Sequence, residues 1–227
     1  AYFDTIPHQR LLARVGTKVS DGRVLSLIGD FLRQRVMNTV EGWTPEEGIP
    51  QGAVVSPLLS NIYLDPLDHL MAEKGFEMVR YADDFVILCR SEPEAQLVLE
   101  TVKSWVASAG LTLHPEKTRI TDMTAVGGGF DFLGYHFWKG YRLPSKKSLR
   151  KVKDAIRTKT KRSHGHSLRV IISEVNGTLR GWFEYFKHSR AAQLVKLDKF
   201  VRQRLRGILR SRRGIRGKAH GLDNYRW

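Results

Sequence analysis

Two adjacent acids, Asp83 and Asp84, carry the clearest chemical signal in the sequence. They lie between the alternating run 76–81 and the apolar run 85–89, and both runs are typical of strands, which leaves Ala82, Asp83 and Asp84 for a tight turn. Asp is common in turns because its side chain bonds the local backbone, and that is the alternative for an isolated pair. A rigid hairpin, however, would hold two like charges together, and these repel unless a cation lies between them. Since carboxylate oxygens are the ligands that Mg²⁺ prefers, the hairpin predicts a divalent-metal site.

The elements that must position this turn follow from the spacing of apolar residues. Helices are predicted at 7–15, 22–32, 56–71 and 92–109, with Asp21 and Ser91 as N-caps. Strands are predicted as a pair within 36–47 around Glu41 and Gly42, at 111–113, and in the hairpin segment 130–137. The order is β-α-β-β-α-β, and the fold class is α+β with the two acids at its central hairpin.

Beyond Lys139 the apolar period becomes helical. Residues 146–162, 167–188 and 191–213 each predict a helix, and the short loops between them indicate a three-helix bundle. Trp182 and Phe186 fall on the apolar face of the second helix and are assigned to packing. The C-terminal part is thus predicted to be all-α.

Charge is divided unevenly along the chain. The 227 residues have a net charge of +15, but residues 1–137 hold 12 Lys+Arg against 18 Asp+Glu, whereas residues 138–227 hold 26 against 5. Most of these C-terminal cations have no internal partner, and nucleic acid is the expected counterion. A membrane surface is the less favoured alternative, because the aromatic residues of this part fall on helix faces that a core would use.

Cysteine content and hydropathy bound the compartment. Cys89 is the one cysteine, so the sequence offers neither a disulfide framework nor a cysteine zinc site, and a reducing compartment is expected. The sequence contains no apolar run of membrane-spanning length and no secretory leader at its start. We therefore expect a soluble cytoplasmic protein, with nucleoid association as an option and no membrane partner.

Several blocks of the sequence resemble the reverse transcriptases encoded by group II introns. The resemblance is carried by residues 81–84 (Tyr-Ala-Asp-Asp), 48–52 (Gly-Ile-Pro-Gln-Gly) with 56–59 (Ser-Pro-Leu-Leu), 114–118, 132–135 (Phe-Leu-Gly-Tyr) and 179–186. In chain order they imply a polymerase palm with a split βαβ sheet over residues 1–137. The last block is similar to the maturase-specific thumb, which implies a basic helical thumb over residues 138–227. The fingers and the C-terminal segment of the family are not matched.

The resemblance also implies a mechanism, two-metal nucleotidyl transfer. Mg²⁺ would be held by Asp83, Asp84 and a third carboxylate that the match places upstream of Ala1. Asp4 would be a neighbour of that ligand and not a ligand itself. On this account the chain alone is expected to be inactive as a polymerase.

Further site residues are implied by the same blocks. Nucleotide and template binding is assigned to Phe3, Pro50, Gln51, Gly52 and Tyr81. Phe3 would floor the sugar pocket and exclude a 2′-hydroxyl, with an ordinary strand aromatic as the alternative. Gly52 would let the backbone approach a base pair, and the Gln51 amide would bond nucleotide or template. Lys117 would neutralise or protonate the leaving pyrophosphate, with a plain loop lysine as the alternative.

The function implied is that of an RNA-directed DNA polymerase of a group II intron that also binds intron RNA to assist splicing. Its partners would be intron RNA, an RNA template with a DNA primer, and dNTP. Arg202, Arg206 and Arg210 are the cations assigned to RNA. One alternative is a noncatalytic RNA-binding maturase that uses the same basic surface. Another is a reverse transcriptase of the retron or CRISPR-associated type, which shares the palm but not the maturase-like thumb.

Overall fold

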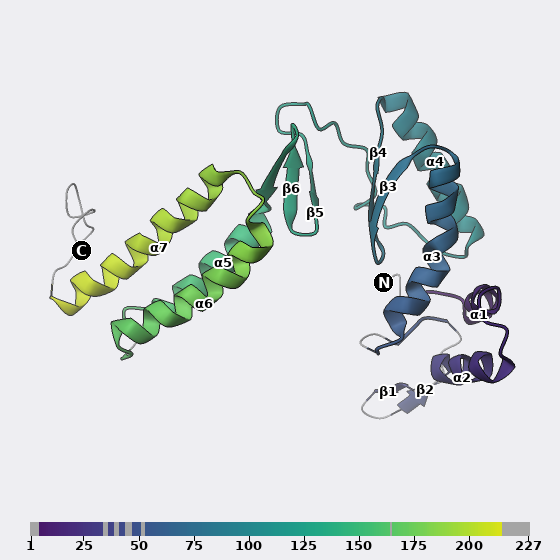
Figure 1. The fold of residues 1–227 in the computed structure, drawn as a ribbon, viewed down its shortest axis with the longest axis horizontal. Coiled ribbons are helices and arrows are strands. Elements are labelled where there is room, and N and C mark those ends of the chain that lie inside the picture. Colours follow the sequence, from purple (N-terminus) through teal and green to yellow (C-terminus); the bar gives the residue numbers. More distant parts are fainter. Residues whose placement is uncertain are drawn as a thin grey trace. The chain divides into compact units, whose positions relative to one another are not determined.

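The chain divides into two compact units, Ala1–Ile120 and Thr121–Trp227, in a computed structural model (Figure 1). The structure describes residues 5–33, 36–38, 41–43, 47–50, 53–163 and 165–214, with the backbone alone at 36–38 and 41–43. Within these residues no helix is long and apolar enough to cross a bilayer. The division falls between Ile120 and Thr121, upstream of the boundary after residue 137 that the sequence suggested.

The first unit contains four helices and two hairpins among its described residues. They are α1 (His8–Gly16), α2 (Gly22–Leu32), β1 (Val36–Asn38), β2 (Glu41–Trp43), α3 (Ser56–Glu73), β3 (Glu77–Tyr81), β4 (Asp84–Leu88) and α4 (Glu92–Ser108). All four predicted helices are confirmed. Both predicted N-caps are confirmed too, because Asp21 accepts from the backbone N–H of Arg23 at 2.8 Å and Ser91 accepts from that of Glu94.

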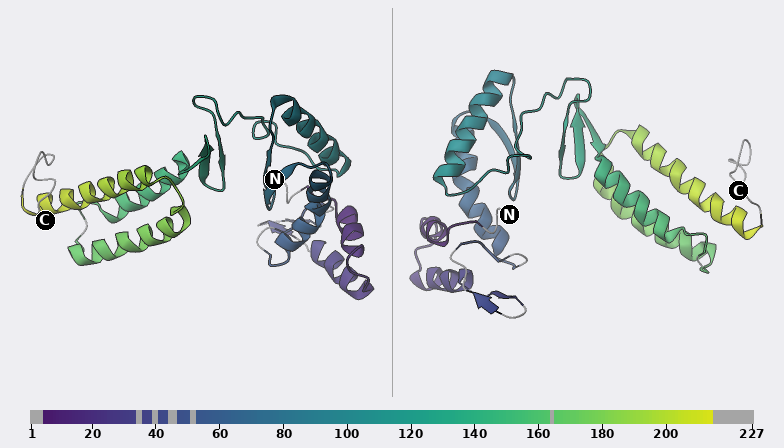
Figure 2. Two further views of the ribbon diagram at one scale, coloured as in Figure 1. Left: turned by 45° about the horizontal axis from the view of Figure 1, so that its top comes forward. Right: turned by 180° about the vertical axis from the view of Figure 1, so that it is seen from behind.

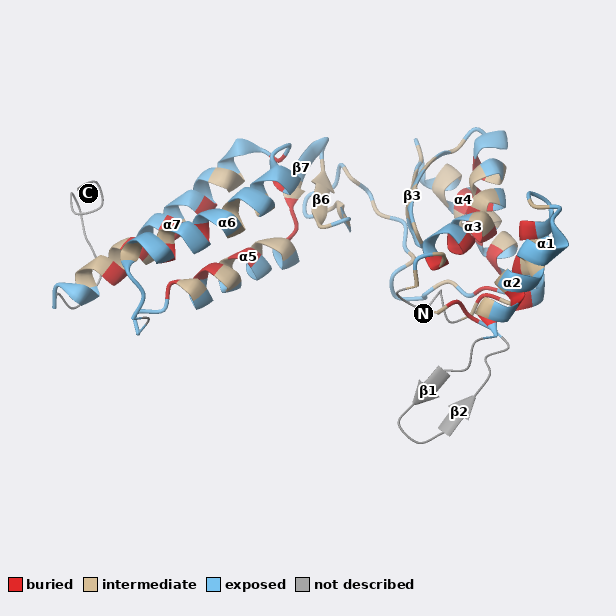
Figure 3. Ribbon diagram, turned by 60° about the horizontal axis from the view of Figure 1, so that its bottom comes forward, coloured by how far each residue is buried: buried red, intermediate tan, exposed pale blue. Residues whose placement is uncertain are grey.

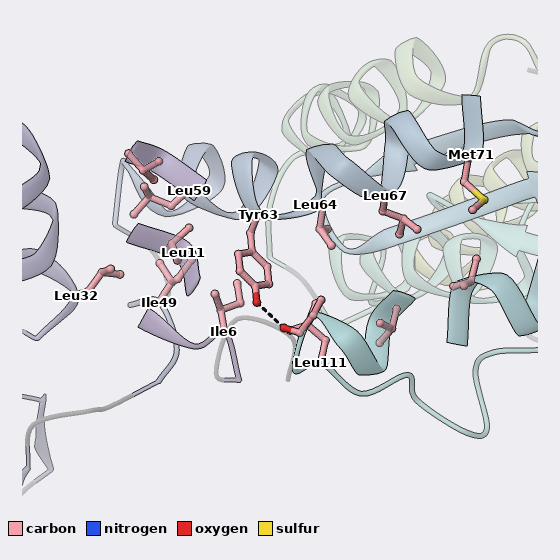
Figure 4. Packing of buried hydrophobic residues seen from close by; sticks show 14 of the residues in the cluster. Ile6, Leu11, Leu32, Ile49, Leu59, Tyr63, Leu64, Leu67, Met71 and Leu111 are labelled. Atoms are coloured by element: carbon pink, nitrogen blue, oxygen red, sulfur yellow. Dashed lines mark hydrogen bonds between the residues drawn. The ribbon is translucent and has the colours of Figure 1, made fainter. Parts of the chain in front are cut away.

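Helix α3 is the centre of the first unit's core. Its buried side chains include Leu59, Tyr63, Leu67 and Met71, which pack among residues from α1 and α4 (Figure 4). Figure 3 shows the buried positions of the first unit's helices in red. The Tyr63 hydroxyl donates to the carbonyl of Ala109 at 2.5 Å, and this bond ties α3 to the end of α4. Burial raises the pKa of Tyr63, against the lowering effect of Arg14 and Arg10. Helix α3 is thus held in the core of the first unit both by packing and by this hydrogen bond.

One strand prediction for this unit is confirmed and another was wrong. The strand pair predicted within 36–47 is present as β1 and β2, although Glu41 and Gly42 lie in β2, where Glu41 pairs with Asn38. Residues 111–113 form no strand: the N–H of Leu111 returns to the carbonyl of Val106 at 2.9 Å beyond Gly110, which has φ +72° and ends the helix. The structure therefore describes α3-β3-β4-α4, the middle of the predicted β-α-β-β-α-β order.

The second unit combines a three-stranded sheet with three helices. Its elements are β5 (Phe130–Phe132), β6 (Tyr135–Trp138), β7 (Tyr141–Pro144), α5 (Lys146–Lys159), α6 (Leu168–Phe186) and α7 (Ala191–Arg212). The three predicted helices are confirmed, and Figure 2 shows them from two further directions. The expectation of an all-α part was wrong, because β7 pairs with β6 in the order β5-β6-β7.

The sheet and helix α6 hold each other through two tyrosines. The Tyr135 hydroxyl donates to the carbonyl of Tyr185, and the Tyr185 hydroxyl donates to the carbonyl of Leu133 at 2.7 Å. Burial raises the pKa of Tyr135. Phe186 is buried, and its ring lies 4.7 Å from that of Trp182, so both residues pack as predicted. The segment 130–137 therefore packs with the helices of the second unit.

Candidate active site

The β3–β4 hairpin presents the two acids at its tip. Tyr81 pairs with Asp84, so Ala82 and Asp83 form a two-residue turn and Asp84 begins β4. The sequence had assigned Asp84 to the turn. Both aspartates are exposed, and Tyr81, at 65% exposure, shares a face of the hairpin with Asp84 because the two are cross-strand partners. The hairpin therefore brings Tyr81, Asp83 and Asp84 together.

The opposite face of the hairpin is anchored to the core. Met78 of β3 and Phe85 and Ile87 of β4 are partly buried against the residues of α3 and α4. Strand residues alternate between faces, so this anchoring fixes which side chains are turned outward. Ala82 has φ +54°, a left-handed conformation that is uncommon outside glycine. The turn with Asp83 and Asp84 therefore belongs to a hairpin whose other face is packed against the core.

Arg80 connects the hairpin to α3, and the sequence interpretation gave it no role. Its guanidinium bonds both carboxylate oxygens of Asp68, at 2.8 Å for Nε to Oδ1. Its Nη1 donates to Asn61 Oδ1 at 2.9 Å and to the carbonyl of Ala82 at 2.9 Å. A signal was available in the sequence, because alternation along 76–81 places Arg80 on the face of Met78, where a cation needs an acidic partner.

The donor chemistry of the turn fits Mg²⁺. Asp83 and Asp84 offer hard carboxylate oxygens that are open to solvent, and these two residues would hold the ion. Among the described residues no group of three or more His, Cys, Asp or Glu side chains could hold a metal. The turn thus places two exposed carboxylates next to each other.

Three hydrogen bonds hold the segment 47–50 in place. The N–H of Gly48 donates to the carbonyl of Ile6 at 2.8 Å, and His8 Nε2 donates to the carbonyl of Gly48 at 2.6 Å. Ser56 Oγ, at the start of α3, donates to the carbonyl of Pro50 at 2.6 Å. Of the predicted nucleotide-binding residues, Pro50 is therefore held by α3. Phe3, Gln51 and Gly52 lie outside the described residues.

Lys117 lies apart from these contacts. It is exposed in the turn after α4, where its N–H donates to the carbonyl of His114 at 3.2 Å. The described residues contain no hydrogen bond or ion pair between Lys117 and either aspartate of the turn. Lys117 is thus an exposed residue of the segment that follows α4.

The three predicted RNA-binding arginines of α7 differ in their surroundings. Arg202 is exposed, and its Nε lies 2.8 Å from Asp198 Oδ2. Arg206 and Arg210 are half-buried, with their Nε atoms out of contact with solvent. A more open set, overlooked in the sequence, is the α5 cation face, which consists of Lys146, Lys147, Arg150 and Lys151. All four are exposed, and none forms an ion pair within the described part of the chain.

Arg204 has a structural position. Its guanidinium donates to Thr160 Oγ1 at 2.9 Å and to the Thr160 carbonyl at 2.8 Å, just past the end of α5. Burial, with smaller contributions from Arg162 and Arg157, lowers its pKa. Arg204 therefore links α7 to the end of α5, although Arg157 and Arg162 carry the same charge nearby.

Two protein-family models match the chain. Residues 1–137 match the family model for reverse transcriptase (RNA-dependent DNA polymerase), and residues 149–225 match that for the group II intron, maturase-specific domain. The chain belongs to the group II intron reverse transcriptase/maturase family. Of the two matched regions, the transcriptase region comes first in the chain.

Three relatives of this intron reverse transcriptase family illustrate the range of similarity. The chain is 28% identical over 170 residues to protein YkfC of Escherichia coli strain K12, covering 60% of the chain and 44% of that protein. It is 22% identical over 283 residues to the putative COX1/OXI3 intron 1 protein of Saccharomyces cerevisiae, covering 98% and 33%. It is 35% identical over 71 residues to the group II intron-encoded protein LtrA of Lactococcus lactis subsp. cremoris, covering 31% and 12%. The chain thus spans less than half the length of these relatives.

Proposed function

We propose that the chain is the palm and thumb part of an RNA-directed DNA polymerase that also binds the RNA of its group II intron and assists splicing. The palm would be residues 1–137 and the thumb residues 138–227. The observation that carries the proposal is the anchored hairpin turn with exposed Asp83 and Asp84. Its partners would be intron RNA, an RNA template with a DNA primer, and dNTP, in the cytoplasm.

In this proposal the hairpin supplies the metal ligands for nucleotidyl transfer. Bound Mg²⁺ would supply Lewis-acid activation of a primer 3′-hydroxyl and charge stabilisation on the phosphates. Asp83 and Asp84 would hold the ions, and Tyr81, on the face shared with Asp84, would contact the nucleotide or template. The segment ending at Pro50 would contact the base pair through its fixed backbone. Lys117 would neutralise or protonate pyrophosphate once a triphosphate brings it near.

RNA binding is assigned to the cations of the second unit. The α5 cation face is exposed and carries no paired acid, which suits contacts to phosphate. Arg202 would join it after exchanging Asp198 for phosphate, while the half-buried Arg206 and Arg210 would contribute less. The excess of cations in residues 138–227 also supports the second candidate, a noncatalytic RNA-binding maturase.

Primer extension on an RNA template separates these two candidates. The purified chain would be assayed alone and joined to an N-terminal segment that contributes an aspartate, together with a Mg²⁺ titration and an RNA-binding measurement. We expect both forms to bind RNA and the extended form to polymerise. Binding without polymerisation in either form would favour the noncatalytic maturase. Extension by the chain alone would instead make Asp4 the third ligand.

A further inference from the structure

We propose that Arg80 is a positioning residue that fixes the acid turn against helix α3. It lies four residues before Asp84, yet its side chain runs to the opposite face of the hairpin and is 11% exposed. The proposal concerns how the turn is held, and only its catalytic consequence rests on the proposed polymerase function.

The contacts of Arg80 form a continuous link from the core to the turn. Asn61 and Asp68 are seven residues apart on α3, about two helical turns, and so lie on one side of that helix. Asp68 takes two parallel hydrogen bonds from the guanidinium, and Asn61 takes one from Nη1. The same Nη1 reaches the Ala82 carbonyl at 2.9 Å. The first turn residue is therefore bonded, through one side chain, to the helix that centres the core.

The backbone conformation of the turn explains why such a restraint matters. Ala82 has φ +54°, a conformation that brings Cβ close to the carbonyl oxygen in an L residue. The charge-assisted bond to the Ala82 carbonyl favours the observed orientation of the peptide group that joins Ala82 to Asp83. The backbone of Asp83 is positioned by this peptide group.

The link requires arginine and not simply a positive charge. A guanidinium presents five donors in a planar fork, and here that fork serves a carboxylate, an amide oxygen and a backbone carbonyl at once. A lysine ammonium at the same position could satisfy Asp68 but not all three groups in the same geometry. Arg80→Lys therefore keeps the charge and removes the connection to the turn.

Amide hydrogen exchange in the full chain tests the link directly. We expect Arg80→Lys to raise exchange of the peptide covering residues 81–85 about tenfold relative to wild type, the loss of one charge-assisted bond. Asp68→Asn should raise it as well, because it removes one of the two parallel bonds without touching the hairpin. The matched control is Arg33→Lys, since Arg33 has an exposed ion pair with Asp30 at 3.7 Å and no bond to the turn.

Two further readouts distinguish positioning from general destabilisation. Melting should show the folded state of Asp68→Asn retained at the assay temperature, while exchange elsewhere in α3 and α4 stays at the wild-type rate. In whichever form extends a primer, Arg80→Lys should lower kcat about tenfold or more and leave KM for primer and template unchanged. Asp68→Glu, which keeps a carboxylate, should lower kcat less than Asp68→Asn does.

The outcomes separate the link from the proposed function. Exchange of residues 81–85 at the rate of the Arg33→Lys control, in both Arg80→Lys and Asp68→Asn, would overturn the role of Arg80. Absence of primer extension by the wild-type chain joined to the aspartate-containing N-terminal segment would count against the polymerase and leave the exchange result to decide the link.

Discussion

In the first unit single polar side chains each hydrogen-bond to one backbone carbonyl, whereas in the second unit many cations lie along the helices and most are exposed to solvent. Arg80 reaches the Ala82 carbonyl, His8 that of Gly48 and Ser56 that of Pro50. On α5, by contrast, Lys146, Lys147, Arg150 and Lys151 are exposed and repeat one chemical group. The first arrangement fixes geometry, and the second supplies charge density.

The comparison implies different sensitivities to substitution. A geometric site fails when one member is lost, because its members are not redundant. A surface that binds phosphates through many cations loses affinity in small, salt-dependent steps. Substitutions in the first unit should therefore have large effects that salt does not change, and those in the second small effects that salt modulates.

The largest effect is expected at the acid turn. Asp83→Asn or Asp84→Asn should abolish primer extension, because an amide does not hold Mg²⁺ as a carboxylate does. The loss should exceed the roughly 10–100-fold cost of removing a partner behind a metal ligand. Rates measured across a Mg²⁺ titration, in whichever form extends a primer, give the comparison.

The matched control for the acid turn is Asp131→Asn, an exposed aspartate of the second unit that pairs with His136 at 2.7 Å. It should extend primers at the wild-type rate. Intron RNA binding should survive in all three variants. Wild-type extension by Asp83→Asn and Asp84→Asn would reduce the pair to an ordinary turn sequence.

A second effect is expected in the core that supports the turn. Tyr63→Phe keeps the ring of a fully buried residue and removes the donor to the Ala109 carbonyl. The free energy of unfolding of the first unit should fall by about 1–3 kcal/mol, the cost of an unsatisfied buried acceptor. Denaturant titration measures the change. Tyr81→Phe, at an exposed tyrosine of the same unit, is the control and should leave stability unchanged.

The sequence predicted the first unit's helices and its acid hairpin because these depend on local patterns. Apolar spacing and the caps Asp21 and Ser91 are properties of neighbouring residues, and the structure retains them. The link through Arg80 depends on α3, whose residue Asp68 lies twelve positions away, and no local pattern specifies that pairing. A positively charged residue on the buried side of a strand was the available signal.

The strand errors have a similar cause. Leu111 lies in a short apolar run, but its N–H is used to close the end of α4, so it is not free to pair with another strand. Strand β7 was missed because its four residues, Tyr141–Pro144, include Arg142 and Pro144 and alternate weakly. Its pairing with β6, where Tyr141 lies opposite Trp138, provides the missing stabilisation.

A smaller effect is expected where α7 meets the end of α5. Arg204→Gln should lower the free energy of unfolding of the second unit by about 1 kcal/mol, because it removes the two hydrogen bonds to Thr160. Relief of repulsion with Arg157 and Arg162 should offset part of the loss, and this offset should shrink as salt screens it. Thermal unfolding at low and high salt measures both terms. Arg202→Gln, at an exposed i,i+4 pair, should change stability by less than about 0.5 kcal/mol.

The smallest effects per residue are expected from the second unit's cations that are proposed to bind RNA. On single-stranded RNA the log–log slope of affinity against salt is roughly −0.7 for each phosphate neutralised. Two triple variants remove the same charge, one at Lys147, Arg150 and Lys151 of the α5 cation face and the other at Arg202, Arg206 and Arg210, each replaced by Ala.

The α5 triple variant should flatten the slope by about 2 units, since its three side chains are exposed and unpaired within the described residues. The α7 variant should flatten it by about 0.7, because Arg206 and Arg210 are half-buried and Arg202 alone is free to exchange its acid for phosphate. Equal changes in both would mean that RNA responds to net charge alone. Slopes unchanged from wild type in both would assign these cations to solvated surface. A larger change in the α7 variant would mean that RNA draws Arg206 and Arg210 out of the bundle, and the second unit would then share the geometric character of the first.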